Sequence, residues 1–219
     1  MRQITLEFPT YSGVKSLLVG LPEGARLEAA APYRHTLPVV YYGSSITQGG
    51  CVSRPGNTYQ AILSRELDTD YVNLGFSGNA KGEAEMARYI ASLPMSVFVM
   101  DYDHNAPNTE HLKATHEPFF RIIREAQPNL PVIFVSRPTA YLSEEEIRMR
   151  EVIRTTWLHA VANGDTHVDF IDGSTLFTGR GGDSCTVDAC HPNDLGFMAM
   201  ANGILPTLRR WIEVSEAKA

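Results

Sequence analysis

Residues 37–219 alternate between short apolar runs, which suit buried strands, and longer segments with helical spacing. The expected strands cover residues 37–42, 71–74, 97–100, 131–135 and 167–171. The expected helices cover residues 58–67, 83–93, 111–126, 143–162 and 195–214. Apolar strands that alternate with helices form a parallel sheet covered on both faces. The sequence therefore predicts an α/β fold, a three-layer α/β/α sandwich around a central five-stranded parallel sheet.

The first 36 residues lack this alternation. Residues 4–8 and 14–21 form two extended runs, and Pro22-Glu23-Gly24 follows them as a turn. We therefore divide the chain into an N-terminal β segment, residues 1–36, and a main domain, residues 37–219. Because exposed strand edges can pair with another chain, a homodimer formed through the N-terminal strands is a further hypothesis.

Composition restricts the partners that this chain is expected to have. Hydrophobic residues make up 43% of the 219 residues, which is enough for a sizeable core. The net charge of −6 and the lack of a Lys/Arg cluster argue against a nucleic acid or an anionic membrane surface as partner. No apolar stretch approaches the ~20 residues of a membrane span, and no apolar leader follows the first residues. Three cysteines fit a reducing compartment, so a cytoplasmic location is expected.

In parallel α/β sheets, the loops that leave the carboxyl ends of the strands carry the chemistry. The first of these loops reads Gly43-Ser44-Ser45-Ile46-Thr47-Gln48-Gly49-Gly50. Ser45 is well placed there to act as a nucleophile, although a phosphate-binding turn or a plain helix cap explains this loop equally well. The loop has neither the Gly-x-Ser-x-Gly nucleophile motif nor a dinucleotide-binding motif, and the chain has no Walker sequence.

A serine hydroxyl attacks poorly unless a base takes its proton, and a third group must orient that base. Asp188 and His191 are three residues apart, just before the last expected helix, and can face the same way. A helix-start cap beside a surface histidine is the simpler explanation of this pair, and Pro192 at the start of the helix fits it. This loop alone leaves both interpretations open.

Together, the four loops resemble the sequence blocks of the SGNH hydrolases, also called the GDSL esterase/lipase family. The matching runs are Gly43-Ser44-Ser45-Ile46, Gly75-Phe76-Ser77-Gly78-Asn79, His104-Asn105 and Asp188-Ala189-Cys190-His191-Pro192. They follow the family's order and span residues 43–192. A further run, Gly49-Gly50-Cys51 through Ser53-Arg54-Pro55-Gly56, resembles a bacterial branch that often carries a β-sandwich domain ahead of the hydrolase domain. Residues 1–36 would then be the remnant of such a domain.

The resemblance implies a flavodoxin-like fold and a serine esterase that works through an acyl-enzyme without a cofactor. Ser45 would be the nucleophile, His191 the general base and Asp188 the residue that orients it. The oxyanion hole would consist of the backbone N–H groups of Ser45 and Gly78 and the side-chain amide of Asn105. The substrate would be a small ester whose short acyl group is hydrolysed or transferred, with an acetylated carbohydrate as the first hypothesis.

Two positions depart from the family's pattern. Ser44 stands where the family usually has Asp, so catalysis is expected to survive with a different local hydrogen-bond network. The third block usually reads Gly-x-Asn-Asp, but here the corresponding run is Asp101-Tyr102-Asp103-His104-Asn105.

Two other functions remain open. Asp101, Asp103 and His104, together with the Asp188–His191 pair, could be the ligands of a metal-dependent hydrolase. Such a mechanism would not need the predicted set of oxyanion donors. The other alternative is a catalytically inactive ligand-binding module on the same fold.

Three further side chains, near or on loops of the active face, are candidates for the substrate pocket: Tyr102, Arg54 and Arg137. Each has a structural alternative, which is a buried position for the tyrosine and an ion pair for each arginine. A disulfide could join Cys51 to Cys185 or Cys190, although three reduced thiols are the simpler interpretation.

Overall fold

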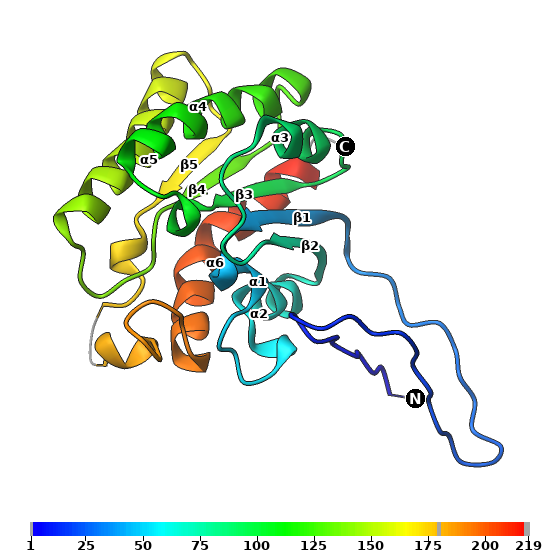
Figure 1. Cartoon of the computed structure of the whole chain (residues 1–219). Coiled ribbons are helices and arrows are strands. Elements are labelled where there is room, and N and C mark those ends of the chain that lie inside the picture. The colour runs from blue at the N-terminus through cyan, green and yellow to red at the C-terminus, as the bar shows by residue number, and fades with distance from the viewer. Residues whose placement is uncertain (1, 179–180, 217–219) are drawn as a thin grey trace.

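The computed structural model describes residues 2–178 and 181–216, and its centre is a five-stranded parallel sheet (Figure 1). The strands are β1 (His35–Gly43), β2 (Thr69–Gly75), β3 (Val97–Asp101), β4 (Val132–Val135) and β5 (Val168–Ile171). They lie in the order β2-β1-β3-β4-β5, and each pairs in parallel with its neighbours. The predicted parallel sheet is confirmed.

Helices connect the strands and cover the sheet. They are α1 (Ser45–Gln48), α2 (Tyr59–Leu67), α3 (Ala84–Ala91), α4 (Thr109–Ala126), α5 (Glu144–Ala162) and α6 (Asp194–Glu216). Four short 3₁₀ turns lie between them: η1 (Pro55–Asn57), η2 (Asp103–Asn105), η3 (Gly173–Thr175) and η4 (Asp183–Cys185). Ser143 and Glu146 form the capping box that the sequence predicts at the start of α5. Among the helices described, none is long and apolar enough to cross a membrane.

The two faces of the sheet belong to two separate hydrophobic clusters. Successive side chains of a strand point to opposite faces, and the four consecutive buried apolar residues of β1, Val39 to Tyr42, follow this rule. Val39 and Tyr41 pack with α2 and α6, whereas Val40 and Tyr42 pack with α3, α4 and α5. Figure 1 shows the resulting three layers. A sheet that is apolar on both faces needs helices on both sides, which accounts for the sandwich.

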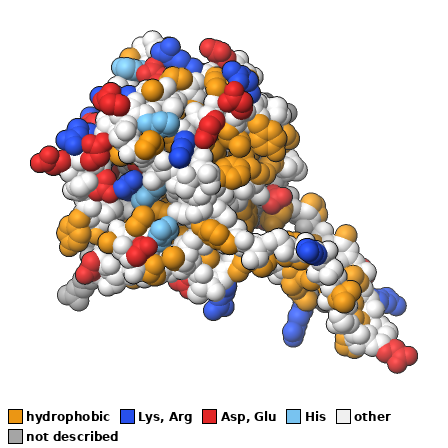
Figure 2. Space-filling view, viewed as in Figure 1, with side chains coloured by type: hydrophobic (Ala, Val, Ile, Leu, Met, Phe, Trp, Pro, Cys, Tyr) orange, Lys and Arg blue, Asp and Glu red, His pale blue; other side chains and the backbone are white. Residues whose placement is uncertain are grey.

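Residues 2–34, which we call the arm, differ from the prediction. The expected strands at residues 4–8 and 14–21 are not formed, and no other strand among residues 2–178 and 181–216 pairs with either segment. The predicted turn is present, with the Ala25 backbone N–H donating to the carbonyl of Pro22 at 3.1 Å. Figures 1 and 2 show the arm extending away from the α/β body before it returns to β1. Residue 1 of the predicted β segment lies outside the described residues.

Candidate active site

The carboxyl ends of β1, β2 and β3 bring the first three loops together. Gly43 lies opposite Gly75 on one side and Asp101 on the other. A Cβ atom on Gly43 would be 2.1 Å from the Asp101 carbonyl oxygen and 2.0 Å from Thr47 Oγ1, so only glycine fits there. The chain then turns directly into α1, and Ser44 caps this helix by accepting a hydrogen bond from the Ile46 N–H at 3.1 Å. Ser45 is the first residue of α1 and faces the last loop.

The last loop presents His191 just before α6. Ala189 has a positive φ of 64°, which turns the chain sharply between the acid and the histidine. The Asp188 Oδ1 atom accepts the backbone N–H groups of Cys190 at 3.0 Å and His191 at 2.6 Å. The aspartate therefore shapes its own turn and, through it, fixes the backbone position of the histidine.

Ser45, His191 and Asp188 form one hydrogen-bonded chain, so the structure joins the three residues that the sequence singles out. The Ser45 Oγ atom lies 2.9 Å from His191 Nε2, and His191 Nδ1 lies 2.7 Å from Asp188 Oδ2. The hydrogen bonds from His191 lower the pKa of Asp188 to about 2, so its carboxylate can only accept. The Nδ1 atom therefore carries the proton, which leaves Nε2 free to accept the Ser45 hydroxyl proton.

Two of the predicted oxyanion donors, Gly78 and Asn105, lie on loops that contact each other. Gly78 has a φ of +70° in the exposed loop after β2. Asn105, at the end of η2, donates from Nδ2 to the Phe76 carbonyl at 2.8 Å. The Gln48 side-chain oxygen accepts the Ser77 N–H at 2.8 Å, which ties the same loop to α1. A primary amide has two N–H groups, so Asn105 retains one for a ligand.

A buried polar cluster behind α1 escapes the sequence analysis. The Oδ2 atom of Asp101 accepts hydroxyl hydrogen bonds from Thr47 and Tyr59, each at 3.1 Å. Burial, and then the nearby Asp103, raises the pKa of Asp101 well above its ordinary value. This cluster joins α1, α2 and β3, and so it stabilises the position of the helix that begins at Ser45. The sequence does not predict the cluster, because Thr47 and Tyr59 lie on different helices and nothing in the sequence shows that they approach the same carboxylate.

The side chains expected for a metal site do not converge. Asp101 is taken up by the buried cluster, and Asp103 Oδ2 accepts the backbone N–H of Arg137 at 2.9 Å. Burial and the neighbouring Arg137 and His191 lower the pKa of His104. Within residues 2–178 and 181–216, no three His, Cys, Asp or Glu side chains form a group that could hold a metal ion. The ligand set of the metal-dependent alternative is therefore not assembled.

Two of the three candidates for the substrate pocket, Tyr102 and Arg137, have structural partners. Tyr102 is 1% exposed, and its hydroxyl contacts Thr115 Oγ1 at 2.9 Å, so the structure places it in the core. Arg137 forms an ion pair with Glu146. Arg54 is exposed at the start of η1, in a loop that Ser53 fastens to α6 by donating to Asp194 at 2.9 and 2.5 Å.

The cysteines are free thiols. Cys185 is buried and Cys51 is exposed, whereas the partly buried Cys190 has its Sγ atom 3.8 Å from His104 Nδ1. The structure thus agrees with three reduced thiols rather than a disulfide.

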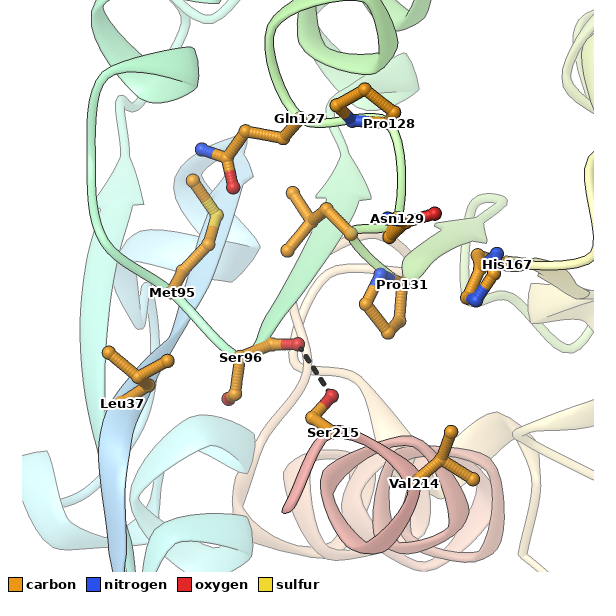
Figure 3. A pocket seen from close by; sticks show the side chains of 11 residues that line it. Leu37, Met95, Ser96, Gln127, Pro128, Asn129, Pro131, His167, Val214 and Ser215 are labelled. Carbon is orange, nitrogen blue, oxygen red and sulfur yellow. Dashed lines mark hydrogen bonds between the residues drawn. The ribbon is translucent and has the colours of Figure 1, made fainter. Parts of the chain in front are cut away.

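A cavity of about 500 Å³ lies at the opposite edge of the sheet. Figure 3 shows its lining, which includes Leu37 near the start of β1, Pro131 just before β4 and His167 just before β5. Ser215 of α6 donates to the Ser96 carbonyl at 3.3 Å beside it. Because Ser45 follows the other end of β1, this cavity is separate from the triad.

One contact to Ser45 comes from outside the main domain. The Tyr11 hydroxyl, on the arm, donates to the Ser45 carbonyl oxygen at 3.3 Å. No motif marks this tyrosine in the sequence, since it lies 34 positions before the nucleophile in a segment without regular structure.

The fold and this site place the chain among α/β proteins with the SGNH-hydrolase architecture. The comparison with protein families agrees, because the model of the GDSL-like lipase/acylhydrolase family matches residues 36–209. The chain belongs to this family.

Solved structures with the same fold come from several proteins. A GDSL-like lipase from Bacteroides ovatus is 28% identical, with a TM-score of 0.76 over 85% of this chain and 56% of that one. A salicylyl-acyltransferase from a tetracycline biosynthetic pathway is 21% identical, with a TM-score of 0.68 over 81% and 54%. A family two carbohydrate esterase from Clostridium thermocellum is 16% identical, with a TM-score of 0.66 over 84% and 67%.

The chain thus spans little more than half the length of the first two of these proteins. No curated protein matches the chain significantly.

Proposed function

We propose that this chain is a serine esterase that hydrolyses, or transfers, a short acyl group from an oxygen ester through an acyl-enzyme. The observation that carries the proposal is the contact of Ser45 Oγ with an imidazole that is held in one tautomer by a carboxylate. Membership of the GDSL-like lipase/acylhydrolase family supports the same chemistry. The resemblance of residues 49–56 to a bacterial branch of the family stays a prediction.

Acylation begins when His191 Nε2 takes the Ser45 proton as the hydroxyl oxygen attacks the ester carbonyl. The Asp188 carboxylate stabilises the imidazolium that forms. The N–H groups of Ser45 and Gly78 and the amide of Asn105 receive the developing oxyanion, because fixed donors are most effective where negative charge appears.

The imidazolium of His191 then protonates the leaving alkoxide, and the acyl group remains on Ser45 Oγ. Deacylation repeats these steps with water in place of the alcohol. His191 removes a proton from water, the hydroxide attacks the acyl carbon, and the proton returns to Ser45. If an acceptor alcohol enters instead of water, the same sequence transfers the acyl group.

The surroundings of the triad favour a small polar substrate. Ser77 and Asn79 lie on the exposed loop after β2, and both have polar side chains. The loop after β2 is exposed from Phe76 to Asn79, so the site is open to solvent. A carbohydrate alcohol that carries an acetyl group fits this environment, and one solved structure with the same fold is described as a two-domain esterase active on acetylated mannans.

A fluorophosphonate probe tests the nucleophile. We expect wild-type protein to be labelled at Ser45 and to hydrolyse p-nitrophenyl acetate, with kcat reduced by several orders of magnitude in Ser45→Ala. Ser92→Ala, at an exposed position after α3, is the matched control and should retain both properties. Lack of labelling and turnover in the folded wild-type protein would favour an inactive binding module. Turnover that requires an added divalent ion and survives in Ser45→Ala would instead favour the metal-dependent alternative.

A second assay separates hydrolysis from transfer. The assay uses p-nitrophenyl acetate as the acyl donor and increasing concentrations of an acceptor alcohol. Whether the enzyme is a hydrolase or a transferase, the release of nitrophenol should depend on Ser45. A transferase would convert the acetyl group to the new ester, whereas a hydrolase would continue to release acetate. The two products are distinguished by mass spectrometry.

A further inference from the structure

We infer that Tyr11, on the N-terminal arm, forms the wall of the active site on the side of the leaving alcohol and contributes to binding a carbohydrate there. This inference rests on the proposed esterase function and adds the arm to its binding site.

The arm is fastened to α1 at the residue before Tyr11. The Gln48 side-chain amide donates to the Thr10 carbonyl at 3.2 Å, while its oxygen accepts the Ser77 N–H of the predicted oxyanion loop. A Cβ atom on Gly49 would lie 3.0 Å from the Thr10 methyl group, so the Thr10 side chain packs directly against Gly49. Gln48 therefore joins the arm to the same loop that carries Gly78, and the arm reaches the site at a defined position.

The Tyr11 hydroxyl lies beside both the nucleophile and the base. It donates to the Ser45 carbonyl at 3.3 Å. The Cβ position of Gly50 lies 3.1 Å from this hydroxyl and 3.4 Å from His191 Cδ2, so the tyrosine and the imidazole border the same small space. Because Gly50 has no side chain, the Tyr11 hydroxyl and the Cδ2 edge of the imidazole ring can approach each other closely on either side of it.

This space lies where the alcohol part of an ester must leave. The carbonyl oxygen of the substrate points toward the donors of the β2 and β3 loops, and the alkoxide must be within reach of His191 Nε2 to receive its proton. The Cδ2 atom is adjacent to Nε2 in the ring. A leaving alcohol that contacts the Nε2 edge therefore meets Gly50 and, beyond it, Tyr11.

The chemistry of Tyr11 suits a sugar. The residue is 52% exposed, so the ring is open to a ligand. A tyrosine has an apolar face, which can cover the C–H groups of a pyranose, and a hydroxyl, which can exchange hydrogen bonds with sugar hydroxyl groups. A small aryl leaving group such as nitrophenol needs much less of this surface.

The test compares two esters in the whole chain. We expect Tyr11→Ala to lower kcat/KM on an acetylated xylo-oligosaccharide by about tenfold more than on p-nitrophenyl acetate, mainly through KM. Tyr11→Phe, which retains the ring, should give a smaller change in this ratio. Tyr89→Ala removes a tyrosine of equal exposure, 52%, on α3 and should leave the ratio unchanged.

The outcomes separate this inference from the proposed function. If the wild-type protein is labelled by fluorophosphonate and both Tyr11 variants keep the wild-type ratio, the role of Tyr11 is refuted and the esterase stands. A wild-type protein that cleaves p-nitrophenyl acetate but not the sugar ester also overturns the inference alone. A wild-type protein that is neither labelled nor active overturns the proposed function itself. Thermal melting of each variant shows whether the substitution affects folding, and Tyr11→Phe preserves the test if Tyr11→Ala unfolds.

Discussion

The carboxylate of Asp188 holds His191 by two routes, with Oδ1 accepting the backbone N–H at 2.6 Å and Oδ2 accepting the ring Nδ1 at 2.7 Å. The first contact fixes the backbone at the turn, and the second fixes the orientation and tautomer of the ring. The aspartate is nevertheless half exposed, because it lies on a surface loop. In the proposed mechanism, the role of Asp188 is thus to orient His191 rather than to take a proton from the substrate.

Replacing this aspartate should affect catalysis less than replacing the nucleophile. In Asp188→Ala, water can still satisfy Nδ1 and His191 can still accept a proton, but the ring loses its fixed orientation. We expect kcat on p-nitrophenyl acetate to fall by about 10⁴-fold, against about 10⁶-fold for Ser45→Ala. Equal losses in the two variants, with both proteins folded, would contradict this division of roles.

Asn105→Ala tests the assignment of the oxyanion hole. Removal of one donor to an oxyanion lowers kcat by about 10²–10³-fold with a smaller change in KM. Asn105 also donates to the Phe76 carbonyl, so its loss frees the loop that carries Gly78. The matched control is Asn129→Ala, which changes an exposed asparagine at the opposite edge of the sheet. An Asn105→Ala enzyme with wild-type kcat would remove this residue from the hole.

Gly43→Ala should destabilise the protein and impair the site together. The added methyl group would meet the Asp101 carbonyl oxygen at 2.1 Å, and backbone cannot move aside as a flexible side chain can. We expect a loss of about 1–3 kcal/mol in the free energy of unfolding, measured by urea denaturation. Gly13→Ala is the control, since a methyl group there has no neighbour within 4 Å. Equal stability of the two variants would show that the β1–β3 contact is looser than the structure indicates.

The main domain could be predicted from sequence because its signals are local. The central strands β3 and β4 contain continuous apolar runs, such as residues 97–100, and the capping box of Ser143 marks the start of a helix within a single turn. The proximity of Ser45, His191 and Asp188 could also be predicted, because the loops at the carboxyl ends of parallel strands lie at the same edge of the sheet whatever the strand order. The strand order itself depends on packing between distant segments, and the local pattern does not determine it.

The strands that were wrongly predicted and the alternatives left open for Tyr102 and Arg137 both depend on contacts that form only in the tertiary fold. Residues 4–8 have the composition of a strand, but a strand requires a partner, and the described structure provides none. The position of Tyr102 after a strand is typical of a pocket wall, but in the fold Thr115 of α4 contacts its hydroxyl and the side chain is buried. Arg137 meets Glu146, which lies only nine residues away, yet nothing in the sequence shows that their side chains face each other. In each case the deciding neighbour comes from the tertiary fold.

The hypothesis that the arm pairs with a second copy stays a prediction. Apolar side chains along the arm are exposed, including Ile4 at 74%, Leu18 at 94% and Leu27 at 80%. Figure 2 shows hydrophobic side chains along the protruding segment. Covering them in a dimer would be favourable. Sedimentation should then show a dimer that Leu18→Glu weakens, whereas a concentration-independent monomer would contradict the hypothesis.

Asp103 gives a prediction about stability and pH. Burial raises the pKa of this carboxyl to about 6, although Arg137 and nearby backbone N–H groups act in the opposite direction. Its Oδ1 atom has no hydrogen-bond partner among the residues described. Because the folded state holds this proton more tightly than the unfolded state, the stabilising contribution is full below about pH 4 and is lost as the pH rises to about 6.

The size of this effect follows from the shift. A change of pKa from 3.8 to about 6 corresponds to about 3 kcal/mol between the two ends of the window. Asp103→Asn cannot ionise, and its side-chain oxygen can still accept the Arg137 N–H. We therefore expect the free energy of unfolding of the variant, relative to wild type, to increase between pH 4 and pH 6 and then to level off. Urea denaturation at half-unit pH intervals measures this difference, and a difference that stays constant across the window would mean that Asp103 is already ionised at pH 4 in the folded protein.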